Sequence, residues 1–183
     1  MSTNQLNLTT PISYDTRTIF LHWASAALVA GLWIIGQTID FFPTGTARIM
    51  VRSLHILFGG ILGILLVARL SWRRHGGIKL PPANADMTGR LAISVHYLLY
   101  ALLLAIVVIG VACVWIRGDN LFNLITVPAF DPGNKALRHD AVELHGLVAN
   151  ILLAVAGFHA AAALWHHFMQ KDGVLRRMLP NLK

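Results

Sequence analysis

Cysteine and charge are both scarce in this chain of 183 residues. Its single cysteine, Cys113, excludes an intrachain disulfide, a zinc site built from several cysteines and an iron–sulfur cluster. Charged residues make up 13% of the chain and hydrophobic residues 56%, which favours a small membrane protein over a soluble domain. Residues 1–16 are polar and lack the apolar core of a cleavable signal peptide, so none is expected.

Proline is absent from four long apolar stretches, at residues 18–39, 53–72, 91–116 and 144–170. About 20 apolar residues are enough for a helix to cross a bilayer. The sequence therefore predicts an all-α protein, an integral membrane four-helix bundle with four transmembrane helices. A single domain over residues 1–183 is expected.

Lysine and arginine are shared unevenly between the two sides that four crossings define. Ten of them fall on the side that holds both termini and the 71–90 loop, and five fall on the other side. Because cytoplasmic segments carry the excess of positive residues, both termini are expected in the cytoplasm. The net charge of +7 then reflects membrane orientation, and no nucleic-acid partner is expected.

The last apolar stretch has no acidic or basic residue except its histidines, which are His145, His159, His166 and His167. Ionisable side chains inside a membrane span are costly, and by default they mark function. His145 and His159 are 14 residues apart, which places both on one helix face, about 21 Å apart along the axis. One helix thus offers an imidazole near each membrane surface.

Histidines in the other stretches lie at matching depths. His55, near the outer start of its stretch, matches His145, whereas His159 has two candidate partners near the cytoplasmic side, His22 and His96. Facing helices of a bundle commonly hold cofactors, and haem b can be held by two histidines. The pattern therefore predicts two haems b. The alternatives are histidines that only form interhelical contacts, or a site for a single metal ion.

Five segments around these histidines together resemble the prokaryotic cytochrome b561 family. They are IFLHW at His22, SLHILFGG at His55, VHYLLY at His96, LHGLVAN at His145 and FHAAAALWHH at His159. The resemblance covers residues 15–180 and is greatest to family members that oxidise superoxide. It implies a di-haem protein of the bacterial inner membrane that takes electrons from periplasmic superoxide and passes them to ubiquinone.

The resemblance also implies residue roles. The haem ligands carry over to His22 with His159 for the inner haem, and to His55 with His145 for the outer haem. The histidine of the quinone site carries over to His166. Quinone reduction consumes protons, and an imidazole exchanges a proton near neutral pH. The alternative for His166 is an interfacial side chain that contacts lipid headgroups.

Oxidation of superoxide is the loss of one electron, so it needs no nucleophile or general base. Cations near the outer end of the bundle would raise the rate of encounter with this anion. The candidates are Arg48, Arg52, Arg117, Lys135 and Arg138. Arg52, three residues before His55, could also pair with a haem propionate. Charges on the outer side balance to about zero, so steering would require a local cluster.

Two other functions fit the same pattern. The chain could be a cytochrome b subunit that docks a periplasmic dehydrogenase or hydrogenase, or a cytochrome that oxidises ubiquinol for a periplasmic carrier. A superoxide oxidase needs no obligatory protein partner, so reduction by superoxide alone separates the first function from the second. The 117–140 segment is expected to be either an interfacial lid or a plain connector. His75 and His139 are expected to be solvated loop residues.

Overall fold

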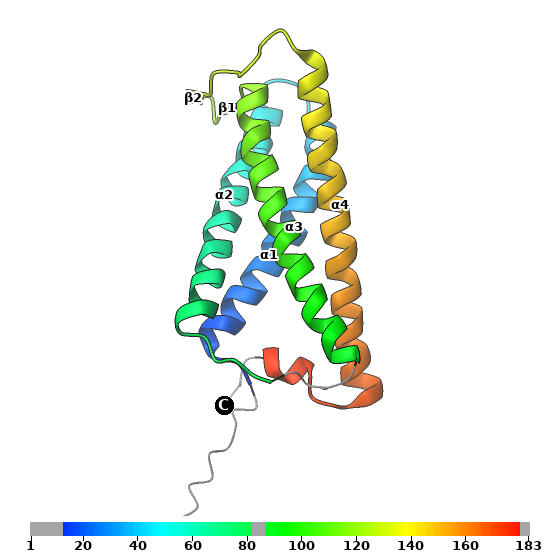
Figure 1. Cartoon of the computed structure of the whole chain (residues 1–183). Helices are drawn as coiled ribbons and strands as arrows, with labels where there is room; N and C mark the ends of the chain where they lie inside the picture. Colours follow the sequence, from blue (N-terminus) through cyan, green and yellow to red (C-terminus); the bar gives the residue numbers. More distant parts are fainter. Residues whose placement is uncertain (1–12, 82–86, 180–183) are drawn as a thin grey trace, which may run out of the picture.

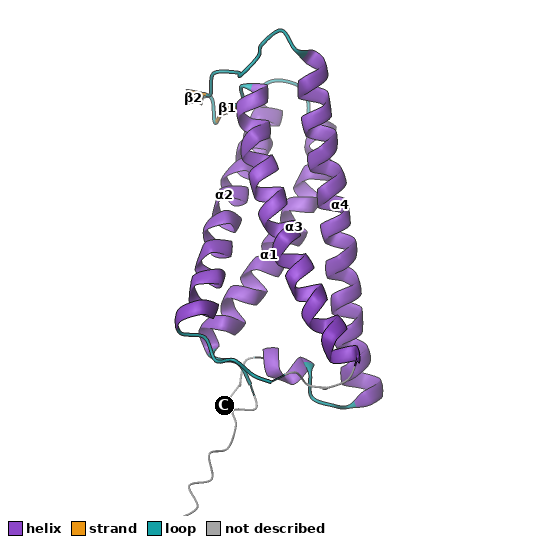
Figure 2. Cartoon of the chain, viewed as in Figure 1, coloured by secondary structure: helices purple, strands orange, loops and turns teal. Residues whose placement is uncertain are grey.

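The computed structural model describes residues 13–81 and 87–179 and consists mainly of four long helices (Figure 1). They are α1 (Thr16–Thr38), α2 (Thr46–His75), α3 (Met87–Arg117) and α4 (Lys135–Trp165). All four are long and apolar enough to cross a membrane, which confirms the expected four-helix membrane bundle. The remaining elements are short (Figure 2): η1 (Ile39–Phe41), β1 (Asn120–Leu121), β2 (Ile125–Thr126), η2 (His166–Gln170) and η3 (Leu175–Met178).

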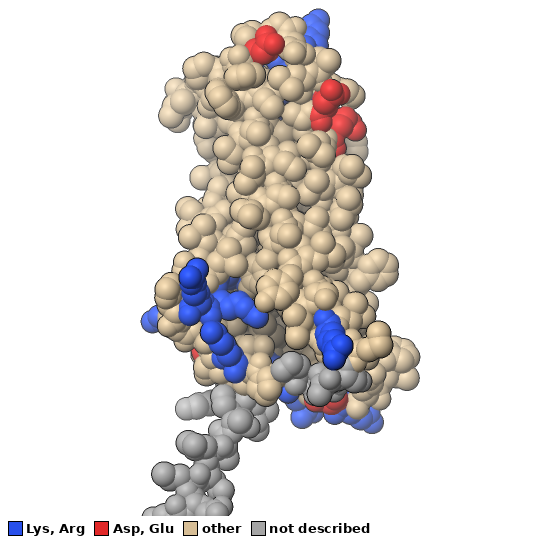
Figure 3. Space-filling view, viewed as in Figure 1, with Lys and Arg blue, Asp and Glu red and all other residues tan. Residues whose placement is uncertain are grey.

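Successive helices run in opposite directions, so α1 begins and α4 ends at the same end of the bundle (Figure 1). The closest packing joins α1 with α2 and α3 with α4, and further contacts between α2 and α3 and between α1 and α4 close the bundle. Charged side chains gather at the two ends and leave the middle of the visible face without charge (Figure 3). Which end faces the cytoplasm stays a prediction from the lysine and arginine counts.

Two helices, α2 and α4, extend well beyond the apolar stretches that predicted them. The side chain of Asn134 accepts a hydrogen bond from the Leu137 N–H and starts α4 at Lys135, nine residues before residue 144. His139 therefore lies in α4, and His75 is the last residue of α2, so the prediction that both are loop residues is wrong. Both side chains are exposed, because the helices extend beyond the apolar stretches.

An apolar layer in the middle of the bundle separates the two levels of histidines. Its buried members are Leu32, Leu62, Leu66, Leu103, Ile106 and Leu152, contributed by all four helices. Leu152 is seven residues from both His145 and His159 on α4. Seven residues are about two turns, so this leucine lies midway between the two imidazole levels, on the same side of the helix.

The segment after α3 folds against the outer end of α2 and is not a plain connector. Asn120 pairs with Thr126 in a two-stranded hairpin, and the turn residues Phe122 and Asn123 both adopt positive φ angles. The Phe122 N–H donates a hydrogen bond of 2.8 Å to the Oγ of Ser53 in α2. Ser53 is fully buried, and its own hydroxyl donates to the Ile49 carbonyl at 2.7 Å. One α2 serine therefore holds the hairpin turn in place.

Replacing Ser53 by alanine should destabilise the folded protein by about 1–3 kcal/mol, because the half-buried Phe122 N–H would lose its acceptor. Ser94→Ala is the matched control, since its exposed hydroxyl bonds only the Arg90 carbonyl one turn earlier in α3. The measurement is the unfolding transition of each purified variant in detergent. Equal transitions for the two variants would show that the hairpin does not depend on Ser53.

Candidate functional site

The outer pair of histidines meets inside the bundle. The ring centroids of His55 in α2 and His145 in α4 are 6.1 Å apart, and the two rings are inclined by 75°. The Nδ1 atoms of both rings are buried and have no hydrogen-bond partner among the described residues. A buried polar atom without a partner costs about 1–3 kcal/mol, so this pair is incomplete without a further group.

Two glycines let the neighbouring helices approach these rings. A Cβ atom on Gly110 of α3 would lie 3.2 Å from the His145 Cε1 atom, and one on Gly36 of α1 would lie 3.4 Å from the same atom of His55. A Cβ atom on Gly59 of α2 would have no neighbouring group within 4 Å, whereas one on Gly63 would lie 3.1 Å from the Val107 side chain. Gly36 and Gly110 therefore allow α1 and α3 to approach the two rings closely, and Gly59 leaves open space one turn from His55.

Three histidines meet at the inner level. The His22 and His159 ring centroids are 6.4 Å apart, and those of His96 and His159 are 5.1 Å apart. The His96 Nδ1 atom lies 2.6 Å from the Ala92 carbonyl oxygen and donates to it, because a carbonyl only accepts. The His22 Nδ1 atom lies 3.3 Å from the Nη2 atom of Arg69. The structure thus brings together both candidate partners of His159.

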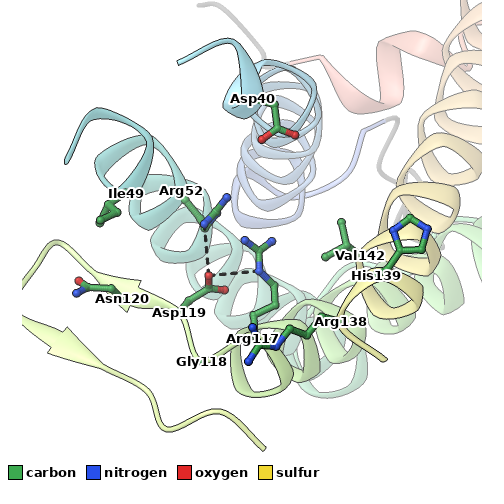
Figure 4. Close-up of a pocket in the computed structure, with 10 residues that line it drawn as sticks. All are labelled: Asp40, Ile49, Arg52, Arg117, Gly118, Asp119, Asn120, Arg138, His139 and Val142. Carbon is green, nitrogen blue, oxygen red and sulfur yellow. Dashed lines mark ion pairs between the residues drawn. The ribbon is translucent and has the colours of Figure 1, made fainter. Parts of the chain in front are cut away.

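A cavity of about 500 Å³ lies at the outer end of the bundle (Figure 4). Its charged lining residues are Asp40, Arg52, Arg117, Asp119 and Arg138. Two lining residues locate the cavity relative to the outer pair. Arg52 comes three residues before His55 in α2, and Val142 comes three residues before His145 in α4. Three residues rise about 4.5 Å along a helix, so the cavity lies about one turn outside the His55–His145 pair.

Asp119 organises the charges in this cavity. Its buried carboxylate lies 3.4 Å from the Arg117 Nε atom and 3.8 Å from an Arg52 guanidinium nitrogen, and both side chains point toward it (Figure 4). Burial raises the pKa of Asp119, against the opposing effect of the Arg117 and Arg52 charges. The Nε atoms of Arg52 and Arg138 are buried and lack a partner among the described residues. Unsatisfied cationic donors of this kind suit an anion.

The remaining steering candidates lie outside the cavity lining. Lys135 is exposed at the first turn of α4. Arg48 is held by Asp40 at 3.4 Å and by the carbonyls of Asp40 and Phe42. Of the five predicted outer cations, the structure therefore gathers three: Arg52, Arg117 and Arg138.

At the opposite end, His166 begins the single π-helical turn η2, and its Nδ1 atom is hydrogen-bonded to the Asp172 carboxylate. Partial burial raises the pKa of Asp172, but hydrogen bonds from His166 and the Val174 N–H prevail and lower it. The turn ends at Lys171, whose positive φ reverses the chain and brings Asp172 back to His166. His167 instead lines a separate cavity of about 230 Å³ near the C-terminal segment.

Sequence reasoning missed three residues at these sites: Arg69, Asp119 and Asp172. Arg69 lies near the end of the second apolar stretch, at residues 53–72, and it reaches His22 inside the bundle. The signal that could have found it is its position 14 residues after His55, the spacing of the two α4 histidines. The contacts of Asp119 and Asp172 depend on chain reversals with positive φ at Gly118 and Lys171, which spacing alone does not give.

Four apolar helices with facing histidines at two depths have the features of a membrane-embedded haem protein. Residues 13–181 match the family described as prokaryotic cytochrome b561, and the chain belongs to that family. It is therefore a haem b electron-transfer protein of oxidoreductase type, and a multi-pass protein of the bacterial inner membrane.

Relatives of nearly the same length carry different names. "Cytochrome b561 homolog 1" of Escherichia coli (strain K12) is 29% identical over 168 residues, which cover 90% of this chain and 96% of the relative. "Probable superoxide oxidase CybB" of Yersinia pestis is 31% identical over 170 residues, which cover 91% and 96%. "Cytochrome b562" of Cereibacter sphaeroides is 27% identical over 175 residues, which cover 91% and 94%.

The spacing of the rings can be compared with what an iron atom between two imidazoles requires. Two metal–nitrogen bonds of about 2.0 Å, plus about 1.2 Å from each nitrogen to its ring centre, give centroids about 6.4 Å apart. The His55–His145 and His22–His159 separations of 6.1 and 6.4 Å fit this value, and the His96–His159 separation of 5.1 Å is about 1 Å too short. The donor set therefore fits haem at both levels.

Within the described residues, no group of three or more histidine, cysteine or carboxylate side chains is arranged to hold a metal ion. The alternative of a mononuclear site built by the protein alone therefore has no donor set in this part of the chain. Haem iron differs, because the porphyrin supplies four ligands and the protein needs to add only two.

Proposed function

We propose that this protein is a superoxide:ubiquinone oxidoreductase with two haems b. Two superoxide ions, one ubiquinone and two protons give two dioxygen molecules and one ubiquinol, which balances atoms, electrons and charge. The observation that carries the proposal is the arginine-lined cavity one turn outside the His55–His145 pair. The name of the relative from Yersinia pestis, a probable superoxide oxidase, supports the same activity.

The proposed haem ligands are His55 with His145 at the outer level and His22 with His159 at the inner level. Ring separations near 6.4 Å support both pairs, and the shorter separation disfavours His96 as the partner of His159. When bound, the two haems supply one-electron transfer between the ends of the bundle. The protein would contribute the imidazoles that hold them, and its apolar layer keeps water away from the space between the two levels.

At the outer end, Arg52, Arg117 and Arg138 would concentrate superoxide, and Arg52 remains the candidate to pair with a propionate of the outer haem. Asp119 offsets part of this charge but leaves more arginines than carboxylates in the lining, where Asp40 is the second acid. Superoxide only has to come close to the outer haem, so positively charged side chains are enough and no group that accepts or donates a proton is needed. That requirement matches a lining made of guanidinium groups.

At the inner end, His166 is the proposed proton donor to ubiquinone. Its Nδ1 atom is hydrogen-bonded to the Asp172 carboxylate, which fixes the orientation of the ring. The Nε2 atom would then face the quinone as the donor. Since η2 lies just beyond the last turn of α4, protons could arrive from the side on which α4 ends.

The first test counts haems. A pyridine haemochrome assay should give two haems per wild-type chain, and His145→Ala should about halve that ratio, because the inner pair keeps both of its imidazoles. The control is His139→Ala, an exposed histidine six residues earlier in α4, which should keep both haems. His22→Ala should also remove one haem and His96→Ala neither; the reverse result would place α3 in the ligand set.

The second test concerns the approach of superoxide to the purified protein without a partner. Arg138→Gln should slow reduction of the haems by superoxide about threefold to tenfold, because the lining loses an unpaired cation. The matched control is Lys135→Gln, which removes the same charge three residues earlier in α4 but outside the cavity. Stopped-flow absorbance at low and high salt measures both rates.

Higher ionic strength should reduce the difference between wild type and Arg138→Gln, because added salt screens the encounter of an anion with exposed cations. Equal slowing by the two substitutions would mean that only net charge matters. Failure of superoxide to reduce wild-type haems without a partner would favour the electron-transfer subunit.

The third test concerns ubiquinone. His166→Ala should slow reoxidation of pre-reduced haems by ubiquinone at least about tenfold, because general acid groups typically contribute a hundredfold or more. Reduction by superoxide should stay near the wild-type rate, since His166 lies at the other end of the bundle. Asp172→Asn should slow reoxidation less, because it removes only the partner of the ring.

His75→Ala is the matched control for this test, an exposed histidine at the end of α2 on the same side of the bundle. Reoxidation of His166→Ala at the wild-type rate would move the quinone site elsewhere, and the cavity beside His167 would be the next candidate.

A further inference from the structure

Arg69 carries a positive charge to the inner level of the bundle. It follows His55 in α2 by 14 residues, the same interval that separates His145 from His159 in α4. The interval places His55 and Arg69 on one face of α2, about 21 Å apart along its axis. At the depth where α4 presents a histidine to the interior, α2 therefore presents a guanidinium group.

The contacts of Arg69 agree with this placement. Its Nη2 atom lies 3.3 Å from the His22 Nδ1 atom, and its guanidinium carbon lies 5.1 Å from the ring centroid of Tyr100 in α3. Among the described residues, no carboxylate forms an ion pair with Arg69. A cation within a membrane span is costly unless an anion or other polar group compensates it. The protein chain thus leaves Arg69 without an anionic partner in the part that the structure describes.

The contact with His22 is incompatible with iron ligation by that ring. A guanidinium only donates hydrogen bonds, so the His22 Nδ1 atom accepts here and the hydrogen of the neutral ring is on Nε2. A neutral imidazole that binds iron through Nε2 carries its hydrogen on Nδ1, where it faces the Arg69 donor. An imidazole that binds through Nδ1 has no lone pair left for Arg69. Ligation by neutral His22 therefore releases the guanidinium, which must find another acceptor.

We propose that Arg69 pairs with a propionate of the inner haem and raises the reduction potential of that haem. This inference rests on the two-haem arrangement proposed above. A propionate is the carboxylate that the surrounding helices do not supply, and a guanidinium can bind it through two hydrogen bonds. Reduction adds one negative charge to the haem. A neighbouring cation favours that state, and it also offsets the propionate charge that would oppose it.

The test is a redox titration of the purified full-length protein, followed by haem absorbance. The inner haem is identified as the one that His159→Ala removes. In Arg69→Gln, the equilibrium ratio of oxidised to reduced inner haem should rise about tenfold at a fixed potential, which corresponds to a midpoint about 59 mV lower. The midpoint of the outer haem should not move, which makes it an internal control.

Two further variants make the result specific. Arg74→Gln removes an equal charge from the last turn of α2, where the side chain is exposed, and should leave both midpoints unchanged. Arg69→Lys keeps the charge and should hold the inner midpoint close to wild type. An unchanged inner midpoint in Arg69→Gln, or an equal shift in Arg74→Gln, would overturn the inference.

If Arg69→Gln loses the inner haem altogether, Arg69→Lys decides. Retention of the haem near its wild-type midpoint would support the charge pairing, and loss of the haem would overturn it. The haem-to-protein ratio of the wild type is measured on the same samples and tests the two-haem arrangement separately. The titration itself needs neither superoxide nor ubiquinone, so failure of the proposed activity would not alter its outcome.

Discussion

Water cannot satisfy polar side chains in the hydrocarbon core of a bilayer, so a bundle that carries histidines there must provide partners for them. Some polar groups of this bundle satisfy one another, as when the Trp33 indole N–H donates to the Asn150 side chain between α1 and α4. The outer histidines do not, because the Nδ1 atoms of His55 and His145 are buried without a partner in the described chain. Haem iron would bind one nitrogen of each ring, which would account for two facing imidazoles in the interior of the bundle.

The polar and apolar groups of the bundle are arranged in levels along its axis. The apolar layer centred on Leu62 and Leu152 fills the middle, where close packing excludes water. Histidine pairs lie on either side of it, and charged groups lie beyond them at the two ends (Figure 3). Chemistry with small charged or protonated molecules belongs at those ends, because the arginine-lined cavity and the His166–Asp172 pair are found there.

Membership of the family fixes the class of the protein more firmly than its substrate. Relatives at 27 to 31% identity align along nearly their whole lengths but carry different names, so the shared bundle does not decide what donates or accepts electrons. That choice depends on the residues at the bundle ends. Here Asp119 joins Arg52 and Arg117, and no carboxylate of the described residues forms an ion pair with Arg138. At the inner level the charge of Arg69 faces His22 from within α2, six residues before the end of that helix.

The sequence by itself determined the four membrane helices and the relative depths of the histidines within the apolar stretches, because apolar length and a rise of about 1.5 Å per residue are local properties. It also matched His55 with His145 in depth, since each was the only candidate at the outer level. Spacing left both His22 and His96 as candidate partners of His159, and only the packing of α1 and α3 against α4 gave them separations of 6.4 and 5.1 Å. Tertiary structure likewise decided which outer cations gather, because Lys135 and Arg138 share a helix end but only Arg138 faces the cavity. The same holds for Asp172, which reaches His166 through a chain reversal at Lys171 that helical periodicity does not encode.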